Sequence, residues 1–329
     1  MQVLLTGANG YLGSILKKNL KRYKIISKDI NIYKDTLDFR KSFTCIDHKT
    51  LNKLYAIIHL AGVSTNYDPP NKIFKKLAYR VNTYDTYNLA LKAKKCGVKK
   101  FIFASSASVY GNYHGKVAHE DSVTNPATSY AISKKKAEDM IMNLADSNFK
   151  VIIFRMVTLY GYSPRMRFDV LINNLAANYI NNGAIILNSN GKLIRPQLHV
   201  LDTIQFYQQA LDNNAIKSGI INIGRNDYNI SILKLAKLIS NKFNYILKIG
   251  KKDTDTRSYK VSFRKQNKVF KKIKFKYDVF YCFKEILNYF DKKHNLKNSK
   301  YYNLKTLEIL KIKNKINNFF ELKLHSLAA

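Results

Sequence analysis

Residues 6–13 read TGANGYLG. They follow a short apolar run, Gln2–Thr6, with the composition of a β-strand, and they open a segment with helical periodicity, Tyr11–Tyr23. Glycine lacks a Cβ, so three glycines between a strand and a helix favour a turn whose backbone can closely approach a ligand or a neighbouring part of the chain. The stretch therefore predicts a strand-to-helix turn at the start of the chain, and the rest of the fold follows from it.

Each glycine of this turn has its own expected purpose. Gly7 permits the tight turn, Gly10 lets the backbone approach a pyrophosphate, and Gly13 permits close packing of the helix on the strand. A phosphate would lie at the helix N-terminus, where unpaired N–H groups and the helix dipole favour negative charge. We therefore predict a dinucleotide site, which also includes Tyr11 and Leu12.

The rest of the first half alternates β-branched runs with helical segments, which predicts a parallel sheet covered by helices on both faces. The expected strands are Lys24–Ser27, Ala56–Leu60, Phe101–Ser105 and Lys150–Phe154, and the expected long helices are Val81–Cys96 and Tyr130–Ala145. A further strand is expected before Tyr55. The sequence leaves open whether this strand ends at Asp38 or at Asp47.

Asp29 stands at the end of the second expected strand, where an acidic residue can accept hydrogen bonds from the ribose hydroxyls of adenosine. A carboxylate at this place repels a 2′-phosphate, which favours NAD over NADP. The alternative is an exposed aspartate at the end of a strand, and the neighbouring Lys28 weakens the charge argument. We predict NAD as the cofactor.

Tyr130 and Lys134 lie four residues apart, and so on one face of their expected helix. A tyrosine with a pKa of about 10 is a poor base at neutral pH, but a nearby ammonium, helped by the charge of nicotinamide, favours the phenolate. Ser106, at the end of a strand, could hydrogen-bond the same substrate oxygen. A Tyr and a Lys four residues apart are common in a chain with 23 tyrosines, so the spacing alone indicates little. The pair indicates a catalytic site because it follows a glycine turn and a serine-rich strand end.

The expected architecture is a Rossmann-type, doubly wound α/β fold with a smaller C-terminal substrate-binding lobe. Residues 1–155 form the NAD-binding domain and carry the Ser-Tyr-Lys site. Residues 156–290 form the lobe, with segments that return to the first domain, because strand and helix patterns resume at Gly219–Ile223 and Ile230–Phe243. Residues 291–329 form a basic C-terminal extension, which we expect to be helical.

At this point the chain resembles the extended short-chain dehydrogenase/reductase family, and within it the NAD-dependent nucleotide-sugar epimerases and dehydratases, of the UDP-glucose 4-epimerase type. Six stretches carry the resemblance, in the order typical of the family and over roughly residues 1–290. They are TGANGYLG at 6–13, HLAG at 59–62, FIFASSASVYG at 101–111, NPATSYAISK at 125–134, RPQLHVLD at 195–202 and DTRSYKVS at 255–262.

The resemblance implies roles for particular residues. Tyr130 matches the acid/base, Lys134 the lysine that lowers its pKa and holds the nicotinamide ribose, and Ser106 the serine that polarises the reacting oxygen. Further cofactor-site residues are Leu60, Ala61, Gly62 and Asn82, and the arginines that bind the substrate diphosphate are Arg195 and Arg257. A guanidinium pairs two phosphate oxygens at once. For Arg257 a surface position remains open, and we interpret His59 as a packed histidine at a strand end.

Two positions narrow the chemistry. Sugar 4,6-dehydratases of this family carry an acidic pair just after the catalytic Ser or Thr, and related decarboxylases carry a Glu there. Ala107 and Ser108 occupy these places and cannot do acid/base work at neutral pH. The stretch SPRMRFD at 163–169 is similar to one epimerase-like branch. Its Arg165 and Arg167 could contact phosphate, organise a dimer or be exposed loop charges.

The predicted activity is NAD-dependent epimerisation of a nucleotide sugar, at C4 of a UDP-hexose, through a transient 4-keto intermediate with Tyr130 as acid/base. An NAD(P)-dependent nucleotide-sugar 4-ketoreductase or dehydrogenase would use the same residues. Alternatives of another class are a polyanion- or membrane-surface-binding protein on a Rossmann scaffold, and an inactive NAD-binding scaffold. The intact Ser106, Tyr130 and Lys134 argue against the last.

The formal net charge of +35, from 57 Lys+Arg and 22 Asp+Glu, allows three explanations: nucleic acid, an acidic membrane surface, or a biased genome. Lysines are scattered between the motifs and no nucleic-acid motif is present, so we expect compositional bias and no specific nucleic-acid partner. Apolar residues among the lysines of 303–324 could form a membrane-surface helix, but we favour a helix packed on the body.

Cys45, Cys96 and Cys282 are isolated and odd in number, which predicts neither disulfides nor a metal site. No apolar run approaches the ~20 residues that span a bilayer. The glycine turn begins so soon after Met1 that no leader is expected, and we predict a cytoplasmic protein. We also predict a homodimer, formed as in relatives by the helices at Val81–Cys96 and Tyr130–Ala145.

Overall fold

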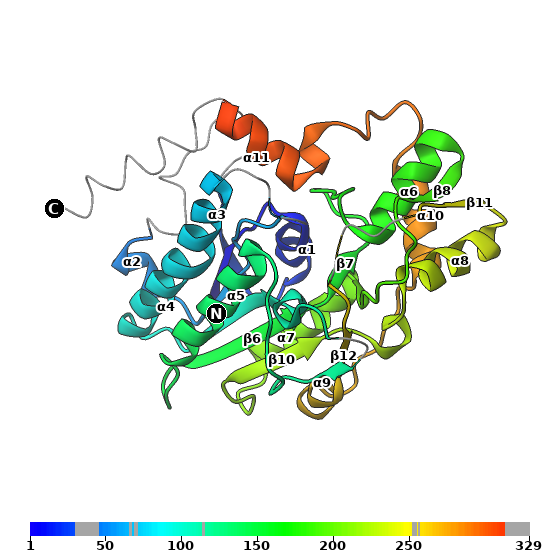
Figure 1. The fold of residues 1–329 in the computed structure, drawn as a ribbon. Coiled ribbons are helices and arrows are strands. Elements are labelled where there is room, and N and C mark those ends of the chain that lie inside the picture. Colours follow the sequence, from blue (N-terminus) through cyan, green and yellow to red (C-terminus); the bar gives the residue numbers. More distant parts are fainter. Residues whose placement is uncertain are drawn as a thin grey trace.

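The computed structural model has an α/β fold in which a parallel sheet carries helices on both faces (Figure 1). The structure describes residues 1–29, 46–65, 68, 72–113, 116–251, 255 and 257–312. Among these residues the central sheet has six parallel strands in the order β10-β6-β4-β3-β1-β2. They are β1 (Gln2–Thr6), β2 (Lys24–Lys28), β3 (Ala56–His59), β4 (Lys100–Ser106), β6 (Lys150–Met156) and β10 (Gly219–Ile223). The expected doubly wound fold is confirmed.

Two apolar cores lie on the two faces of this sheet, because successive side chains of a strand point in opposite directions. In β1, Val3 and Leu5 belong to one core and Leu4 to the other, and all three are fully buried. The first face is covered by α1 (Tyr11–Asn19) and α7 (Ile204–Asp212), and the second by α2 (His48–Leu51), α4 (Thr86–Lys95) and α5 (Ser129–Met142). Burial on both faces explains the continuous apolar runs of the strands.

One expected helix is divided in the structure. The segment expected as one helix over Val81–Cys96 consists of a π-helix, Arg80–Asp85, and then α4. The π-helix continues directly from α3 (Lys72–Tyr79), so the helical segment is longer than expected and runs without a break from Lys72 to Lys95. A π-turn accommodates an extra residue and re-aims the side chains in it, and such turns are frequent at functional sites.

The strand expected before Tyr55 does not end at Asp47. The Asp47 carboxylate accepts a hydrogen bond from the Thr50 N–H at 2.6 Å, and it caps α2. Asp38, the other candidate, lies outside the described residues.

Parts of the second half of the chain form a smaller lobe beside the sheet, whereas α7 and β10 belong to the sheet half (Figure 1). Short parallel strand pairs join β8 (Ala184–Leu187) to β11 (Ile246–Ile249), β7 (Thr158–Tyr160) to β9 (Gln197–His199), and β5 (Val117–Ala118) to β12 (Lys260–Val261). The lobe helices are α6 (Leu171–Asn182), α8 (Ile232–Phe243) and α10 (Val279–Tyr289), and α9 (Arg264–Val269) packs beside β10. The lobe has its own apolar core, which includes Leu175, Leu235 and Phe283.

The last described helix, α11 (Asn303–Ile312), returns from the lobe to the Rossmann half, where it meets α3 (Figure 1). Leu304 and Leu307 pack against Phe74 and Leu77 of α3. Among the described residues, no helix is both long and apolar enough to cross a membrane.

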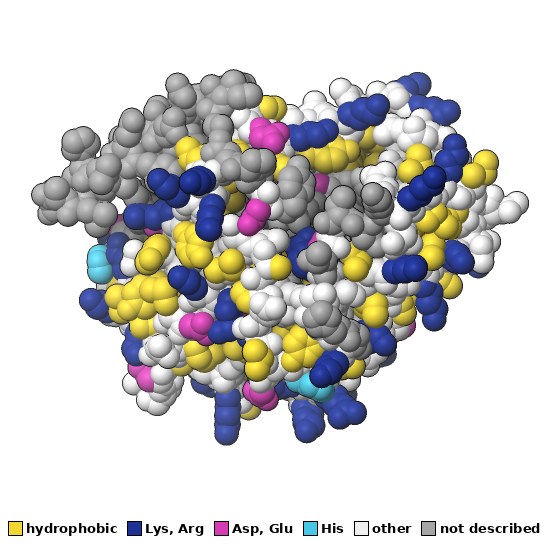
Figure 2. Space-filling view, in the orientation of Figure 1, with side chains coloured by type: hydrophobic (Ala, Val, Ile, Leu, Met, Phe, Trp, Pro, Cys, Tyr) yellow, Lys and Arg dark blue, Asp and Glu magenta, His cyan; other side chains and the backbone are white. Residues whose placement is uncertain are grey.

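Lys and Arg side chains are spread over the visible face of the molecule, whereas Asp and Glu side chains are few there (Figure 2). The basic side chains on this face do not gather over one element. This distribution fits a compositional origin of the positive charge better than a single binding surface for a polyanion.

A buried ion pair ties α5 to β6. Arg155 and Glu138 are 2% and 0% exposed, and Arg155 Nη2 lies 2.8 Å from Glu138 Oε2. Arg155 Nη1 also donates to the Tyr110 hydroxyl and to the Glu120 carbonyl, each at 3.0 Å, and the Ser105 hydroxyl donates to Glu138. These hydrogen bonds offset the cost of taking two charges out of water.

We expect Arg155→Met to lower the free energy of unfolding by about 3–5 kcal/mol, because it leaves the Glu138 carboxylate buried without its cation. Adding Glu138→Met should recover much of that loss, since neither charge of the pair then remains buried without its partner. Urea unfolding of the single and double variants measures both effects. A double variant less stable than Arg155→Met would contradict the explanation by an unpaired charge.

Candidate active site

The glycine turn is held against the end of β3 with no room for side chains. Gly7 has a φ of +68°, and a Cβ built on it would lie 2.7 Å from the Ala61 nitrogen. A Cβ on Gly13 would lie 1.9 Å from the Gly7 carbonyl oxygen. Both positions therefore need glycine, because the backbone of α1 packs directly on the turn and the turn packs directly on the segment after β3.

This cradle fits the diphosphate of a dinucleotide. Gly10 caps α1 in an extended conformation, so Tyr11 and Leu12 form the first helical turn, whose N–H groups have no intrahelical acceptors. Asp29 lies at the edge of the turn, where its Oδ2 accepts a hydrogen bond from the Asn9 N–H at 2.6 Å. An acid at this place can also receive ribose hydroxyls, as the sequence predicts.

The side chain of Tyr11 reaches out of the glycine turn into the lobe. Its hydroxyl donates to the Gly161 carbonyl at 2.6 Å and accepts from the Asn173 amide at 3.1 Å. The Ser163 hydroxyl donates to the Tyr11 carbonyl at 2.7 Å, and it lies 2.9 Å from the Ser14 hydroxyl. The loop that follows β7 is thus fastened to the cofactor helix.

Asn82, in the π-helix, organises the segment after β3. Its Oδ1 accepts from the Val63 N–H at 2.7 Å, and its Nδ2 donates to the Val63 carbonyl at 2.9 Å and to Ser133 Oγ at 3.0 Å. Gly62 lies between this amide and Lys134, because a Cβ on Gly62 would come within 2.9 Å of Asn82 Oδ1 and 3.3 Å of Lys134 Nζ. The predicted residues of the β3 end and the helix are thus brought together.

His59 is fully buried between two threonines. Its Nδ1 lies 2.7 Å from Thr6 Oγ1, its Nε2 lies 2.9 Å from Thr86 Oγ1, and its ring stacks on Phe103. Burial, with the charge of Lys134, holds the pKa of His59 well below its usual value. This confirms the interpretation of His59 as a packed histidine.

Lys134 is buried beneath the site. Its ammonium donates to the Ala104 carbonyl at 2.9 Å and lies 4.5 Å from the centroid of the Phe103 ring. Burial lowers the pKa of Lys134 to about 7, although the charge of Glu138 opposes this change. The ammonium is 6.0 Å from the centre of the Tyr130 ring, on the same helix face as predicted.

Tyr130 and Ser106 meet where β4 ends and α5 begins. Burial raises the pKa of Tyr130, whereas the charge of Arg167 and hydrogen bonding to the side chains of Ser106 and Ser64 lower it. Ser106 Oγ accepts hydrogen bonds from the Ser108 N–H at 3.1 Å and the Ser108 hydroxyl at 2.8 Å. The position next to Ser106 is held by Ala107, which is buried. No carboxyl group therefore stands at either position after Ser106.

Arg195 and Arg257 share one carboxylate. Asp255 Oδ2 lies 2.7 Å from Arg195 Nη2 and 2.6 Å from Arg257 Nη2. Arg195 Nη1 is buried and has no hydrogen-bond partner among the described residues, and its guanidinium lies 5.3 Å from the centre of the Tyr259 ring. Tyr259 is also close enough to Tyr130 for its charge to raise the pKa of Tyr130. The arginine pair therefore lies on the Tyr130 side of the lobe.

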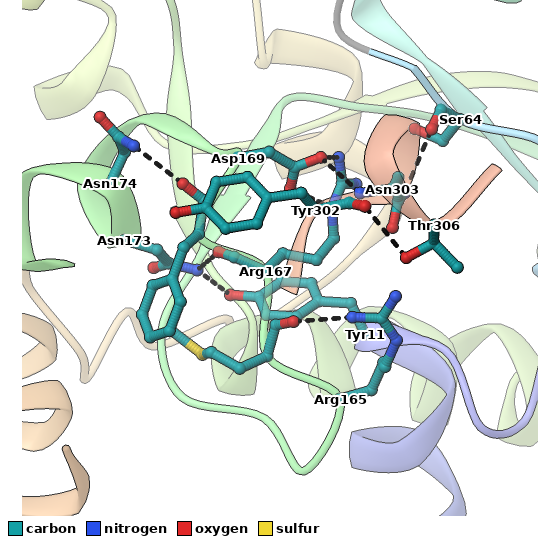
Figure 3. A network of polar contacts seen from close by, with 12 residues as sticks. Tyr11, Ser64, Arg165, Arg167, Asp169, Asn173, Asn174, Tyr302, Asn303 and Thr306 are labelled. Atoms are coloured by element: carbon teal, nitrogen blue, oxygen red, sulfur yellow. Dashed lines mark hydrogen bonds and ion pairs between the residues drawn. The ribbon is translucent and has the colours of Figure 1, made fainter. Parts of the chain in front are cut away.

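Arg165 and Arg167 are not exposed loop charges (Figure 3). Arg167 forms a two-point ion pair with Asp169, with Nε–Oδ1 at 2.8 Å and Nη2–Oδ2 at 3.0 Å. The positive charge of Arg167 acts to lower the pKa of Tyr130 and the pKa of Tyr11. Burial and the charge of Arg167 lower the pKa of Arg165 to about 10, against the opposing charges of Asp169 and Asp29.

Comparison with protein families gives the site its context. A model of the NAD dependent epimerase/dehydratase family matches residues 3–224, more than half of the chain. The chain belongs to this family. It is therefore an NAD-dependent enzyme, and the glycine cradle fits that cofactor.

The relatives of this chain include proteins named as epimerases and proteins named as dehydratases. The chain is 26% identical over 266 residues to the uncharacterized UDP-glucose epimerase YtcB of Bacillus subtilis, over 73% of this chain and 82% of that protein. It is 29% identical over 259 residues to a dTDP-D-glucose 4,6-dehydratase of Bos taurus, over 72% and 71%. The crystal structure of UDP-glucuronic acid 4-epimerase from Bacillus cereus with UDP-glucuronic acid and NAD shares the fold, with a TM-score of 0.73 at 22% identity, over 88% and 98%.

Several residues of the epimerase/dehydratase site carry weak sequence signals. Asp255 was visible only as the first letter of a matched stretch, and Asp169 only as the last letter of SPRMRFD. Ser64 and Asp68 lie in a segment that no motif covers, yet Asp68 Oδ1 accepts from the Ser129 N–H at 2.9 Å at the start of α5. Among the described residues, no group of three or more His, Cys, Asp or Glu could hold a metal ion.

The low pKa of Lys134 makes the stability of the protein depend on pH. Below about pH 7 both the folded and unfolded states hold the proton, and the folded state bears the cost of a buried ammonium. Between about pH 7 and the ordinary 10.5 only the unfolded state keeps it, so stability rises with pH in this window. Lys134→Met lacks this gain.

We therefore expect the stability of Lys134→Met relative to wild type to be highest below pH 7 and to fall by a few kcal/mol toward pH 10. Thermal unfolding of both proteins across this range measures it. Lys135→Met, which removes an ammonium from the next position of the same helix, serves as the control. A constant difference between Lys134→Met and wild type would contradict the prediction.

Proposed function

We propose that the protein epimerises a nucleotide sugar at C4, with a UDP-hexose as substrate and Tyr130 as acid/base. The observation that carries the proposal is the meeting of Tyr130 with Ser106, beside positions that hold Ala107 and Ser108 in place of acids. This site can move one proton at one oxygen, which is what inversion through a ketone requires of the protein.

Tyr130 would take the proton of the C4 hydroxyl and return it. Its neighbours suit this task, because Arg167 and the hydroxyls of Ser106 and Ser64 favour the phenolate against the effect of burial. Ser106 would also hold the reacting oxygen by donating its own O–H to it, while the Ser106 oxygen still accepts the bond from Ser108. NAD, when bound, supplies the acceptor and donor of the hydride.

Arg195 and Arg257 would hold the substrate diphosphate. Both are half-buried and point to one carboxylate, and Arg195 has a buried donor atom without a partner among the described residues. A diphosphate held at this one place lets the sugar, as a 4-keto intermediate, turn over and present its other face. The same grip would serve a 4-ketoreductase, so these arginines support the substrate class and not the direction of the reaction.

Dehydration is disfavoured by the groups after Ser106. Removal of a carbon-bound proton and expulsion of water require groups that titrate near neutral pH. Ala107 has no such group, and the Ser108 hydroxyl already donates to Ser106. The similarity to dehydratases therefore reflects shared ancestry of the fold and the cofactor site.

A homodimer is also part of the proposal. The helices expected to form it, Val81–Cys96 and Tyr130–Ala145, correspond to the segment from Arg80 to Lys95 and to α5, which lie side by side on one face of the sheet. Tyr84, in the π-helix, is 54% exposed although it is a large aromatic residue. An exposed aromatic side chain on this helix fits a surface that a second copy covers.

The decisive test of the activity is incubation with UDP-sugars, with and without NADH, and product analysis by NMR. We expect inversion at C4 without net oxidation of NADH. Consumption of one NADH for each product would identify a ketoreductase and overturn the epimerase proposal.

We expect Tyr130→Phe to lose at least 100-fold in turnover while it retains NAD binding, because the ring is kept and only the proton-transferring oxygen is removed. Turnover and calorimetric NAD binding measure the two effects. Tyr281→Phe is the matched control, since Tyr281 is a tyrosine 45% exposed on α10 of the lobe. Full activity in Tyr130→Phe would refute Tyr130 as the acid/base.

Asp29→Asn should weaken NAD binding by roughly tenfold and reduce the preference for NAD over NADP, because the charged acceptor for the ribose hydroxyls is lost. Titration of wild type and variant with both dinucleotides measures this. Asp47→Asn, at an exposed helix cap, controls for the general loss of a negative charge. Unchanged discrimination between NAD and NADP would exclude Asp29 from the ribose site.

A further inference from the structure

The C-terminal extension crosses from the lobe to the Rossmann half next to the site (Figure 1). It leaves the lobe at Tyr301, whose carbonyl accepts the Phe168 N–H at 3.0 Å. It then enters α11, where Leu304 and Leu307 pack on α3. The residues between these two anchors span the two halves of the molecule, and we call 301–307 the strap.

Asn303 is the residue of the strap that contacts both halves (Figure 3). Its backbone N–H donates to Asp169 Oδ2 at 3.2 Å, in the lobe. Its side-chain amide donates to the Ser64 carbonyl at 3.1 Å, in the Rossmann half. A single asparagine therefore joins two loops that are more than 100 positions apart in the sequence.

Each of these two contacts leads to Tyr130. Asp169 holds the Arg167 guanidinium by two hydrogen bonds, and Arg167 is the cation whose charge most favours the Tyr130 phenolate. The Ser64 side chain hydrogen-bonds with Tyr130 itself. The Asn303 side-chain amide thus fixes the backbone of Ser64. The Asn303 backbone N–H fixes Asp169, which is the partner of Arg167.

The strap is held rigidly enough to position these groups. The Thr306 hydroxyl lies 2.8 Å from the Ser299 carbonyl and 3.0 Å from the Tyr302 carbonyl, which ties the first turn of α11 to the residues before it. Phe168 also packs edge-on against Tyr301, with ring centroids 5.0 Å apart. The position of Asn303 is therefore determined from both sides.

We propose that Asn303 is a positioning residue of the active site, which holds Ser64 against Tyr130 and, through Asp169, fixes the Arg167 guanidinium whose charge acts on Tyr130. The proposal rests on Tyr130 as the acid/base. It gives the C-terminal extension a function in the proposed reaction, although no atom of the strap needs to touch the substrate.

The proposal is tested by the titration of Tyr130. Among the described residues, the charged and titratable groups that face Tyr130 are Lys134 from its own helix, Arg167 from the loop before α6, and Tyr259 from the segment before β12. The chain has 23 tyrosines, so the phenolate of Tyr130 is isolated as the ultraviolet difference between each variant and the same variant with Tyr130→Phe. The measurement uses the full-length protein without substrate.

We expect Arg167→Met to move the Tyr130 titration upward by roughly one pH unit, because a favourable cation is lost. Asn303→Ala should move it in the same direction by roughly half a unit, and the pH profile of turnover should follow. Asn303→Leu, which keeps about the same size and the backbone N–H and adds no charge but cannot donate to Ser64, should act like Asn303→Ala. Asn298→Ala is the matched control, since its amide oxygen binds only within the extension, at Lys300 N–H.

A Tyr130 titration that stays at the wild-type value in a folded Asn303→Ala or Asn303→Leu protein would overturn the proposal. Thermal unfolding shows whether each variant is folded. Either of the two substitutions is sufficient for the test, so the test still works if one of them does not fold. An equal shift in Asn298→Ala would also overturn it, because the effect would then belong to the extension in general. Failure of the acid/base proposal is a separate result, seen as full turnover in Tyr130→Phe.

Discussion

The direct backbone contact between the glycine turn and the end of β3 is the constraint on which the site depends. A Cβ at Gly13 would overlap the Gly7 carbonyl, and one at Gly7 would overlap Ala61. Helix α1 can therefore start only at this distance from the sheet. Because all strands of the sheet are parallel, their carboxyl ends share one edge, and the cofactor cradle, Ser106 and Tyr130 meet there.

Around this edge, the protein balances burial against charge. Burial makes the Lys134 ammonium easier to deprotonate and makes the Tyr130 hydroxyl harder to ionise. Arg167, kept charged and half-buried by Asp169, counters the second effect from the opposite half of the molecule. The site is therefore a product of both halves, and neither the Rossmann half nor the lobe holds all of its charges.

Local patterns predicted most of the fold. The strands at Gln2–Thr6 and Gly219–Ile223 were predicted to the residue, because buried parallel strands are short apolar runs between turn residues. The π-helix at Arg80–Asp85 contains no Gly or Pro that would mark a break, so the sequence indicated one regular helix there. Asp47 looked like a strand end since a helix cap and a strand end both favour Asp.

The site could be predicted only where its residues belong to a motif. Ser106, Tyr130 and Lys134 occupy fixed places relative to strand and helix ends, and their positions follow from the fold. The contact of Asn303 with Ser64 joins residues 239 positions apart, and no periodicity or composition marks either of them. Arg167 was recognised as a notable charge, but its pairing with Asp169 and its closeness to Tyr130 depend on how the loop after β7 folds.

Tyr11 gives this arrangement a mechanical consequence. Its hydroxyl is bonded to Gly161 and Asn173, and Ser163 is bonded to its carbonyl, so the first turn of α1 and the first loop of the lobe share several short bonds. The lobe cannot swing away from the cofactor helix as a free hinged flap without breaking them. Access to the dinucleotide cradle must then depend on smaller local movements of the surrounding loops.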